Sequence, residues 1–249
     1  MTDQQNMLCQ DIANLGVQSS DTILVHTAFG SLGQLDNGAD TIIGALRDAV
    51  GGDGTLCMPA LSYKDIDWNA PVFDQAHTAS CIGFLPEYFR QLPGVQRSMH
   101  ITHSVSAIGA RAQELLGEHH LDHTPGGPHS PYAKMRDAGG TILMIGCGLG
   151  PNTTMHAIEE TAEAPYLFIE GLYAYKAIRI DASEEELRTK RHGTFGQYYE
   201  RIAEHIGDTH LRCGHVGQAQ AYLIDCRHLW QVAIECMKND PYCFSRTPS

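Results

Sequence analysis

The sequence lacks any uninterrupted apolar run of the ~18 residues that a membrane-spanning helix needs. Its first residues, Met1–Asn6, have neither the basic nor the apolar region of a signal peptide. We therefore expect a cytoplasmic protein without a membrane partner. The eight cysteines are dispersed along the 249 residues and show no C-x-x-C spacing. This pattern predicts reduced thiols instead of a disulfide framework.

Basic residues are also scarce, with 17 Lys and Arg against 29 Asp and Glu and a formal net charge of -12. Such a balance excludes nucleic acid as an expected partner, because binding a phosphate backbone requires excess positive charge. It is compatible with a cationic small-molecule substrate. Acidity alone also serves solubility, so the charge does not decide the substrate. The sequence leaves a homodimer open.

The pattern of apolar residues predicts an α/β protein. Strands and helices alternate up to about residue 165 and the rest is richer in strands, which is typical of a three-layer αβα or mixed α+β sheet. Without a linker or repeat, we expect one domain over residues 1–249, with a β-rich C-terminal part. The predicted strands are 21–26, 55–59, 105–108, 141–145, 166–170, 172–181 and 219–224, and the predicted helices are 4–15, 38–50, 81–91, 110–116, 131–138, 151–163 and 226–237.

A histidine and a glutamate follow the strand predicted at 141–145. His156 and Glu159 lie three residues apart on the helix predicted from Pro151, so they share one helix face. The carboxylate can accept a hydrogen bond from one imidazole nitrogen and leave the other as a proton acceptor. The functional hypothesis is a general base with its orienting acid, and the alternative is a surface ion pair. Pro151 at the third-glycine position excludes a dinucleotide-binding loop.

Three further segments carry polar groups that could bind ligands. The loop 27–33 after the first strand could cradle a phosphate or pantetheine group, or could be a plain turn. Arg97 is a candidate phosphate clamp, since guanidinium binds phosphate bidentately. The aperiodic region 60–80 mixes acids with aromatic residues suited to an amine. His119, His120 and His123 make a metal-dependent hydrolase a weaker hypothesis.

Five motifs follow one another in order along the chain, namely His26–Gly33, Gly51–Pro59, Arg97–Gly109, Thr124–Pro131 and Asn152–Glu159. Together they resemble the aminoglycoside 3-N-acetyltransferase family, which uses acetyl-CoA and differs from the common GNAT fold. The resemblance covers roughly residues 10–170.

The resemblance implies direct acetyl transfer from acetyl-CoA, without a metal, to an amine of an aminoglycoside, most simply its 3-amino group. His156 would be the general base oriented by Glu159, with Thr154 and Ser104 as hydrogen-bond donors near the thioester. The cofactor-binding residues would be Thr27, Phe29, Gly30, Ser31, Leu32, Gly33, Arg97, His103, Ser104 and Val105. The substrate-binding residues would be Tyr63, Asp65, Asp67, Asp74 and Glu163.

Two alternatives stay open beside this hypothesis. The acceptor could be a different small-molecule amine, or the protein could bind acyl-CoA or another ligand without catalysis. An acyl-enzyme on Ser104 or Cys147 is a second chemical route, although neither residue lies in a recognised nucleophile elbow.

Overall fold

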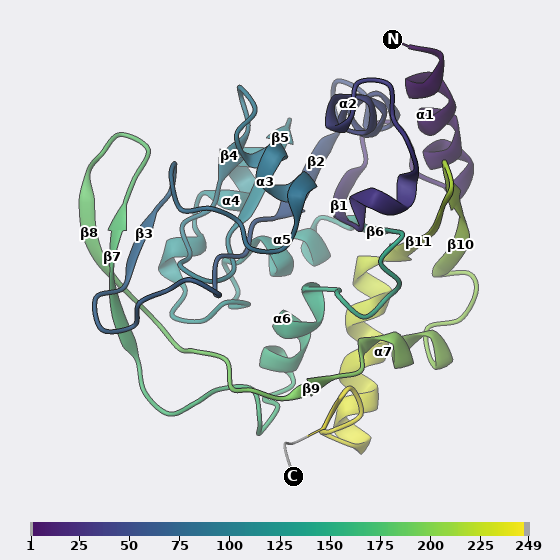
Figure 1. The fold of residues 1–249 in the computed structure, drawn as a ribbon. Coiled ribbons are helices and arrows are strands. Elements are labelled where there is room, and N and C mark those ends of the chain that lie inside the picture. Colours follow the sequence, from purple (N-terminus) through teal and green to yellow (C-terminus); the bar gives the residue numbers. More distant parts are fainter. Residues whose placement is uncertain (1, 247–249) are drawn as a thin grey trace.

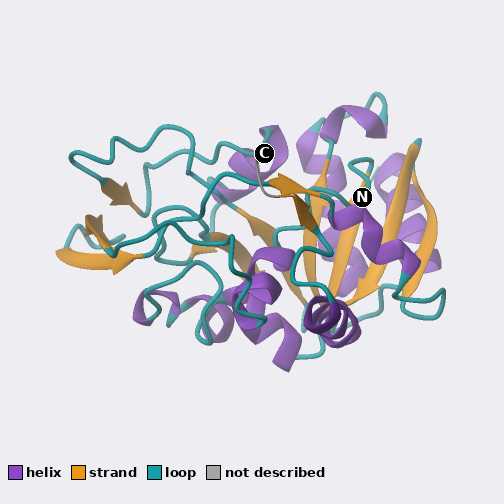
Figure 2. Cartoon of the chain, turned by 90° about the horizontal axis from the view of Figure 1, so that it is seen from below, coloured by secondary structure: helices purple, strands orange, loops and turns teal. Residues whose placement is uncertain are grey.

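The computed structural model describes residues 2–246, and a seven-stranded mixed sheet forms its centre. The strand order is β10-β11-β6-β1-β2-β5-β4, and among its neighbouring pairs in the described chain only β6–β1 and β1–β2 are parallel. Figure 2 shows the strands in orange with the helices around them. Their bounds are β1 Thr22–Thr27, β2 Thr55–Pro59, β4 Gln96–Arg97, β5 Val105–Gly109, β6 Thr141–Ile145, β10 Leu211–Val216 and β11 Ala219–Asp225.

Helices cover both faces of this sheet, because alternate side chains of the buried strands point to opposite faces. On β6, Ile142 and Met144 pack into one apolar core, whereas Leu143 and Ile145 pack into the other. The first core is covered by α4 Ala112–Leu116, α5 Pro131–Asp137, α6 Thr154–Thr161 and α7 Cys226–Asn239, and the second by α1 Asp3–Leu15, α2 Ala39–Val50 and α3 Phe84–Arg90. The predicted three-layer α/β class is confirmed.

A smaller three-stranded sheet lies to one side of the main sheet (Figure 1). It consists of β3 Val72–Asp74, β7 Tyr173–Ile178 and β8 Glu184–Thr189, and it has its own small core around Phe73 and Tyr175. From β8 the chain returns toward α7, where β9 Gly196–Gln197 pairs with β12 Ser245–Arg246. The short 3-10 helices are η1 Phe29–Leu32, η2 His119–Leu121 and η3 Tyr199–Glu204. The C-terminal part is β-rich, as predicted.

Local signals predicted several helix ends correctly. The side chain of Asp225 accepts a hydrogen bond from the backbone N–H of His228 and caps α7, and Gly16 ends α1 with a positive φ of 122°. Within residues 2–246, no helix is both long and apolar enough to cross a bilayer.

Tertiary contacts overrode other local signals. The helix predicted at 81–91 begins only at Phe84, because the N–H groups of Ser80 and Cys81 bond to Glu87 and to the Leu61 carbonyl. The helix predicted from Pro151 begins at Thr154. The strand predicted at 166–170 was wrong, since only a single bridge forms there, between Phe168 and His192.

Candidate active site

A cavity of about 900 Å³ opens where the parallel strands β1 and β2 end. Its wall includes residues from β1, the turn after β6, the start of α6, the loop 59–68 and the segment 191–199. Open α/β sheets bind ligands beyond the carboxyl ends of their strands, and this cavity occupies that position. The side chains that line this cavity therefore form the candidate active site.

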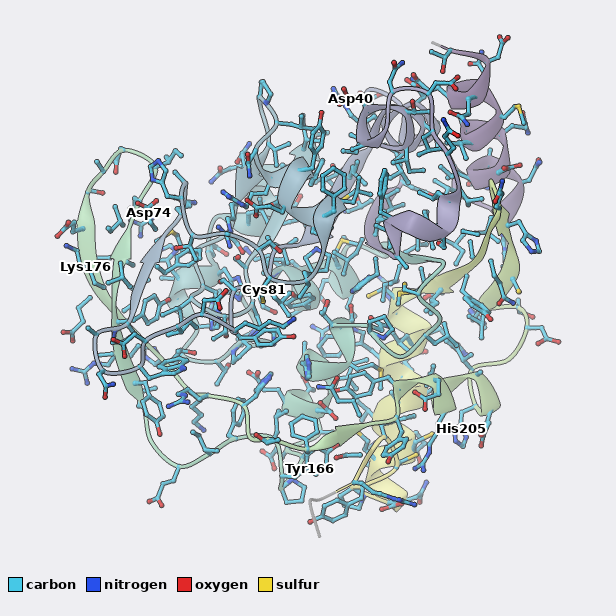
Figure 3. The ribbon with its side chains drawn as sticks, viewed as in Figure 1. Asp40, Asp74, Cys81, Tyr166, Lys176 and His205 are labelled. Atoms are coloured by element: carbon cyan, nitrogen blue, oxygen red, sulfur yellow. The ribbon has the colours of Figure 1, made fainter. Side chains whose placement is uncertain are left out.

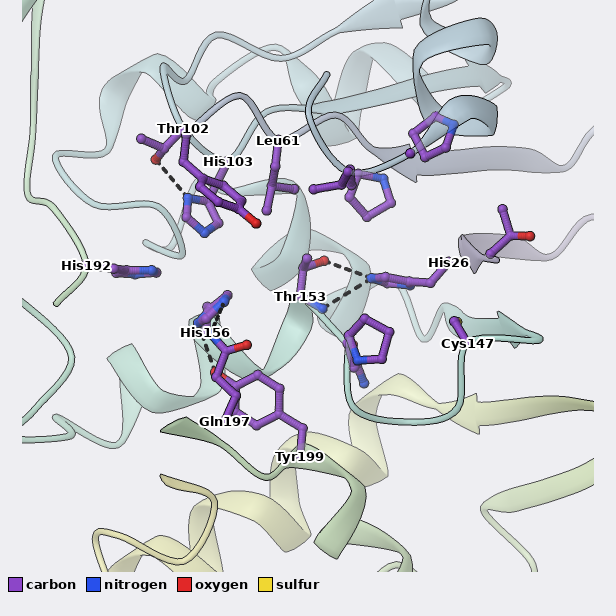
Figure 4. Close-up of a pocket in the computed structure, with 18 of the residues that line it drawn as sticks. His26, Leu61, Thr102, His103, Cys147, Thr153, His156, His192, Gln197 and Tyr199 are labelled. Carbon is purple, nitrogen blue, oxygen red and sulfur yellow. Dashed lines mark hydrogen bonds between the residues drawn. The ribbon is translucent and has the colours of Figure 1, made fainter. Parts of the chain in front are cut away.

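His156 lies on the first turn of α6 and faces this cavity (Figure 4). Its Nδ1 is 3.3 Å from Oε2 of Glu159, whose side chain is fully buried, so the predicted pairing is present. The side chain of His156 is only 12% exposed. Its Nε2 lies 3.5 Å from the amide nitrogen of Gln197, which is long for a hydrogen bond. The pair therefore leaves one imidazole nitrogen for a ligand.

Two tyrosines hold the carboxylate that orients His156. The Tyr199 hydroxyl donates to Oε2 of Glu159 at 2.8 Å, and the Tyr166 hydroxyl donates to Oε1 at 2.8 Å. Tyr199 also lies 3.0 Å from Nδ1 of His156. Burial, and then the Glu159 charge, raise the pKa of both phenols well above their usual value, so both remain donors. Hydrogen bonds from neutral donors offset the cost of burying the carboxylate charge.

A second buried histidine holds the start of α6. Nε2 of His26 accepts a hydrogen bond from the backbone N–H of Thr153 at 3.2 Å and lies 2.9 Å from the Thr153 hydroxyl (Figure 4). Burial lowers the pKa of His26 to about 3, so this imidazole is neutral at pH 7. The contact ties β1 to α6 and places the Thr153 hydroxyl in the cavity wall.

The predicted site residues separate into two groups. Six of them reach the cavity, namely Thr27, Phe29, Gly30, Tyr63, His103 and His156. Glu159 does not line the cavity, but its carboxylate contacts Nδ1 of His156. Ser31, Leu32, Gly33 and Val105 are not part of the cavity wall, and neither is Thr154, whose side chain is fully buried. Thr153, one residue earlier, occupies the place expected for Thr154.

Arg97 and Ser104, two of the predicted ligand-binding residues, lie buried behind the cavity. Arg97 is buried and its guanidinium donates to Oγ of Ser104 and to the carbonyl oxygens of Ala60 and Thr78. Ser104, fully buried, donates to the Ala60 carbonyl. Neither lines the cavity. The guanidinium therefore has hydrogen-bond partners inside the protein and does not face the cavity.

The acids expected to bind an ammonium group also lie outside the cavity wall. Asp74, on β3 in the small sheet (Figure 3), binds His77 and two backbone N–H groups, and Asp67 binds Asn69. Asp65 and Glu163 do not line the cavity. Over residues 2–246, the residues that line it include no Asp or Glu. The carboxylates therefore serve turns and surfaces and do not form the wall.

A cation occupies part of the wall instead. The Arg191 guanidinium lies over two aromatic rings that contact each other edge to face, 4.0 Å from the centroid of Trp68 and 4.8 Å from that of Tyr173. In the described chain it has no carboxylate within ion-pair distance. The folded chain turns Arg191 and His192 into the cavity, although neither was among the predicted site residues.

The histidines considered for a metal do not gather. His119 is buried between the Ser98 hydroxyl and the Pro125 carbonyl, and Nδ1 of His123 lies 3.3 Å from the carbonyl of Arg188. A different set, His103, His156 and His192, surrounds the cavity end nearest α6 (Figure 4). Burial lowers the pKa of His103 and His192 well below the usual value, and neighbouring imidazoles add to this effect. Both are neutral at pH 7.

Comparison with known proteins gives consistent results. The sequence profile described as aminoglycoside 3-N-acetyltransferase matches residues 24–238. Aminoglycoside N(3)-acetyltransferase IX of Micromonospora chalcea is 33% identical over 90% of this chain and 89% of that protein. Aminoglycoside N(3)-acetyltransferase IV of a Salmonella species is 31% identical over 97% and 90%.

Solved structures show the same similarity. AAC-IIIb in a binary complex with CoASH superposes with a TM-score of 0.83 and 30% identity, covering 98% of each chain. AAC-VIa bound to sisomicin gives a TM-score of 0.80 and 27% identity, covering 94% of this chain and 97% of that one.

Proposed function

Because the chain belongs to the aminoglycoside 3-N-acetyltransferase family, we propose that it transfers the acetyl group of acetyl-CoA directly to an amine, with His156 as general base. The observation that carries this proposal is the His156–Glu159 pair in the cavity wall, with one imidazole nitrogen directed to the cavity. The matched region includes both sheets, and we infer that they act as one catalytic domain.

The pair can perform the proton transfers that amine acetylation requires. An ammonium must lose a proton before its nitrogen can attack the thioester carbonyl, and Nε2 of His156 accepts that proton. The Nδ1–H then points to Glu159, whose negative charge stabilises the imidazolium. The nitrogen–carbon bond forms and the carbon–sulfur bond breaks. Converting the ammonium to an amide releases two protons: one passes through His156 to the departing sulfur of CoA, and the other leaves to solvent.

A hydrogen-bond donor must stabilise the oxyanion that develops on the carbonyl. Sequence reasoning assigned this role to Thr154 and Ser104, but their side chains do not line the cavity. The Thr153 hydroxyl does, and it lies at the start of the helix that carries His156. We therefore assign the donor role to Thr153, whose hydroxyl hydrogen turns from Nε2 of His26 to the oxyanion while the Thr153 backbone N–H keeps its bond to that nitrogen.

Direct transfer is better supported than an acyl-enzyme. Ser104 is fully buried and bonded to the Ala60 carbonyl, so it is not available as a nucleophile. Cys147 lines the cavity, but burial raises the pKa of its thiol, which disfavours the reactive thiolate. A cavity of about 900 Å³ lies at the upper end of the range for ligand pockets. The side with Phe29 and Gly30 suits the pantetheine arm.

Two acceptor classes follow from different observations. Aminoglycosides come first, because the relatives are named for them and one neighbour is bound to sisomicin. The second class is an amine that also carries a carboxylate or phosphate. It is favoured by the unpaired Arg191 guanidinium and by a wall without Asp or Glu, which offers nothing to pair with several ammonium groups.

The test is release of free CoA thiol from acetyl-CoA with a panel of acceptors. The panel includes gentamicin- and kanamycin-type aminoglycosides, neutral monoamines, and amines with one carboxylate or phosphate. Release with none of them overturns the proposed reaction. The His156→Ala variant should lose turnover but still bind CoA in calorimetry. Such a loss separates catalysis from simple acyl-CoA binding, since a binding protein has no turnover to lose.

A further inference from the structure

Three imidazoles meet at one end of the cavity. His103 precedes β5, His156 lies on α6, and His192 follows β8, so three separate segments converge there (Figure 4). Their ring centroids form a triangle with sides of 4.7, 4.7 and 5.3 Å. One nitrogen from each ring lies within 4.8 Å of those of the other two.

The hydrogen bonds around this triangle leave nitrogens available. Nδ1 of His103 is 2.7 Å from the Thr102 hydroxyl, and Nδ1 of His156 faces Glu159. Nε2 of each ring is thus left for another partner. Nε2 of His192 is buried and has no hydrogen-bond partner among the described residues. A buried polar atom without a hydrogen-bond partner lowers the stability of the fold, so this nitrogen is a candidate ligand-binding atom.

We propose that His103, His156 and His192 (the histidine triad) bind a divalent transition-metal ion such as Zn²⁺, and that this metal blocks acetyl transfer. Three neutral imidazoles are a ligand set that zinc uses, with a fourth position open to water or another ligand. Oxygen or hydroxyl partners on the opposite ring nitrogens, here Thr102 and Glu159, are the usual supports of histidine ligands.

The triad needs only a small closing movement to hold zinc. Zinc–nitrogen bonds of about 2.0–2.1 Å in tetrahedral directions set neighbouring nitrogens about 3.4 Å apart. The present separation of up to 4.8 Å therefore shortens by roughly 1.4 Å, which small side-chain rotations can supply. The metal would take the lone pair on Nε2 of His156, the one that accepts the substrate proton. The metal site stands without the proposed function, whereas the inhibition rests on it.

A second group of metal-binding side chains requires a control. His205, Cys236 and Cys243 also bring three ligand atoms within 4.8 Å of one another, near the end of α7. Zinc there would contribute to any binding isotherm. We therefore base the experiment on the full chain with Cys236→Ser and Cys243→Ser, which removes the thiolates and leaves the histidine triad intact.

The experiment titrates Zn²⁺ into this background by calorimetry and by equilibrium dialysis with metal analysis. We expect one zinc per chain. His192→Ala should weaken the affinity by at least about 100-fold, and Glu159→Gln by about 10–100-fold through the orientation of His156. His215→Ala, on the exposed face of β10, is the matched control and should leave the affinity unchanged. His103→Gln repeats the test if His192→Ala does not fold, as judged by circular dichroism.

Absence of stoichiometric zinc in the background protein, or equal affinity in the triad variants, overturns the site. Inhibition is then measured with an acceptor identified in the panel. Zinc should abolish thiol release and a chelator should restore it fully. Zinc that binds with undiminished turnover overturns the blocking role. Failure of every acceptor would instead refute the proposed reaction, and the binding result would stand.

Discussion

Replacing Glu159 with glutamine tests the proposed base most directly, since it keeps the shape of the side chain and removes its charge. The carboxylate oxygen lies 3.3 Å from Nδ1 of His156. Two unit charges at that distance attract by about 5 kcal/mol at an effective dielectric constant of about 20. At about 1.4 kcal/mol per power of ten, this sets an upper limit between three and four powers of ten in rate. We therefore expect kcat to fall by about 10²–10³-fold, below this limit.

The assay is thiol release at saturating acetyl-CoA, with the KM for acetyl-CoA expected to stay within a few-fold of wild type. Tyr166→Phe is the matched control, because it removes a 2.8 Å hydrogen bond to the same carboxylate but leaves the charge and the His156 contact. Its kcat should fall far less than that of Glu159→Gln. A Glu159→Gln protein that folds normally and turns over within tenfold of wild type would show that the carboxylate is structural, and the base assignment would be wrong.

The remaining predictions concern stability and specificity. Tyr199→Phe removes a charge-assisted hydrogen bond to the buried Glu159 carboxylate, so the unfolding free energy measured by urea denaturation should fall by about 1.5–3 kcal/mol. An unchanged unfolding free energy would show that this hydrogen bond does not stabilise the fold. Burial raises the pKa of Glu160 to about 7, so its contribution to stability is complete below an unfolded pKa near 4.5 and is lost as pH rises through 7. Wild type should therefore lose stability between pH 5 and 8 relative to Glu160→Gln, which urea denaturation at both pH values measures. Leu229→Ala in α7 should cost about 2–5 kcal/mol, because the side chain is fully buried in the core under α6; thermal unfolding that matches wild type would refute the packing. Arg191→Ala should raise the KM for anionic amine acceptors at least tenfold and leave neutral amines unaffected, and an equal effect on both would remove the anion-binding role.

The sequence was sufficient where structure depends on near neighbours. The continuous apolar run in 141–145 predicted the buried strand β6, and the interval between His156 and Glu159 predicted a shared helix face, because both follow from local sequence. The cap at Asp225 was predictable for the same reason.

The partners of these residues were not predictable in the same way. Tyr199 lies 40 residues from Glu159 along the chain, and Thr153 lies 127 from His26. Such pairs depend on the sheet order and on the path of the chain after β8, which no local pattern encodes. Tyr199 is buried in the core, and the same residue also contacts both His156 and Glu159. Thr154 was named in place of Thr153 because a helix start cannot be located to one residue from sequence.

The two sides of the cavity come from different parts of the fold, and this separation has a functional consequence. His156, Glu159 and Thr153 are fixed by α6, which packs on the main sheet and is tied to β1 through His26. Arg191 is held by Trp68 and Tyr173, on a loop and on the edge of the small sheet. In the proposed reaction, side chains that touch only the acceptor can therefore change without moving His156. We expect the charge of the cavity wall to decide between the two proposed acceptor classes, while the proposed acetyl transfer stays the same.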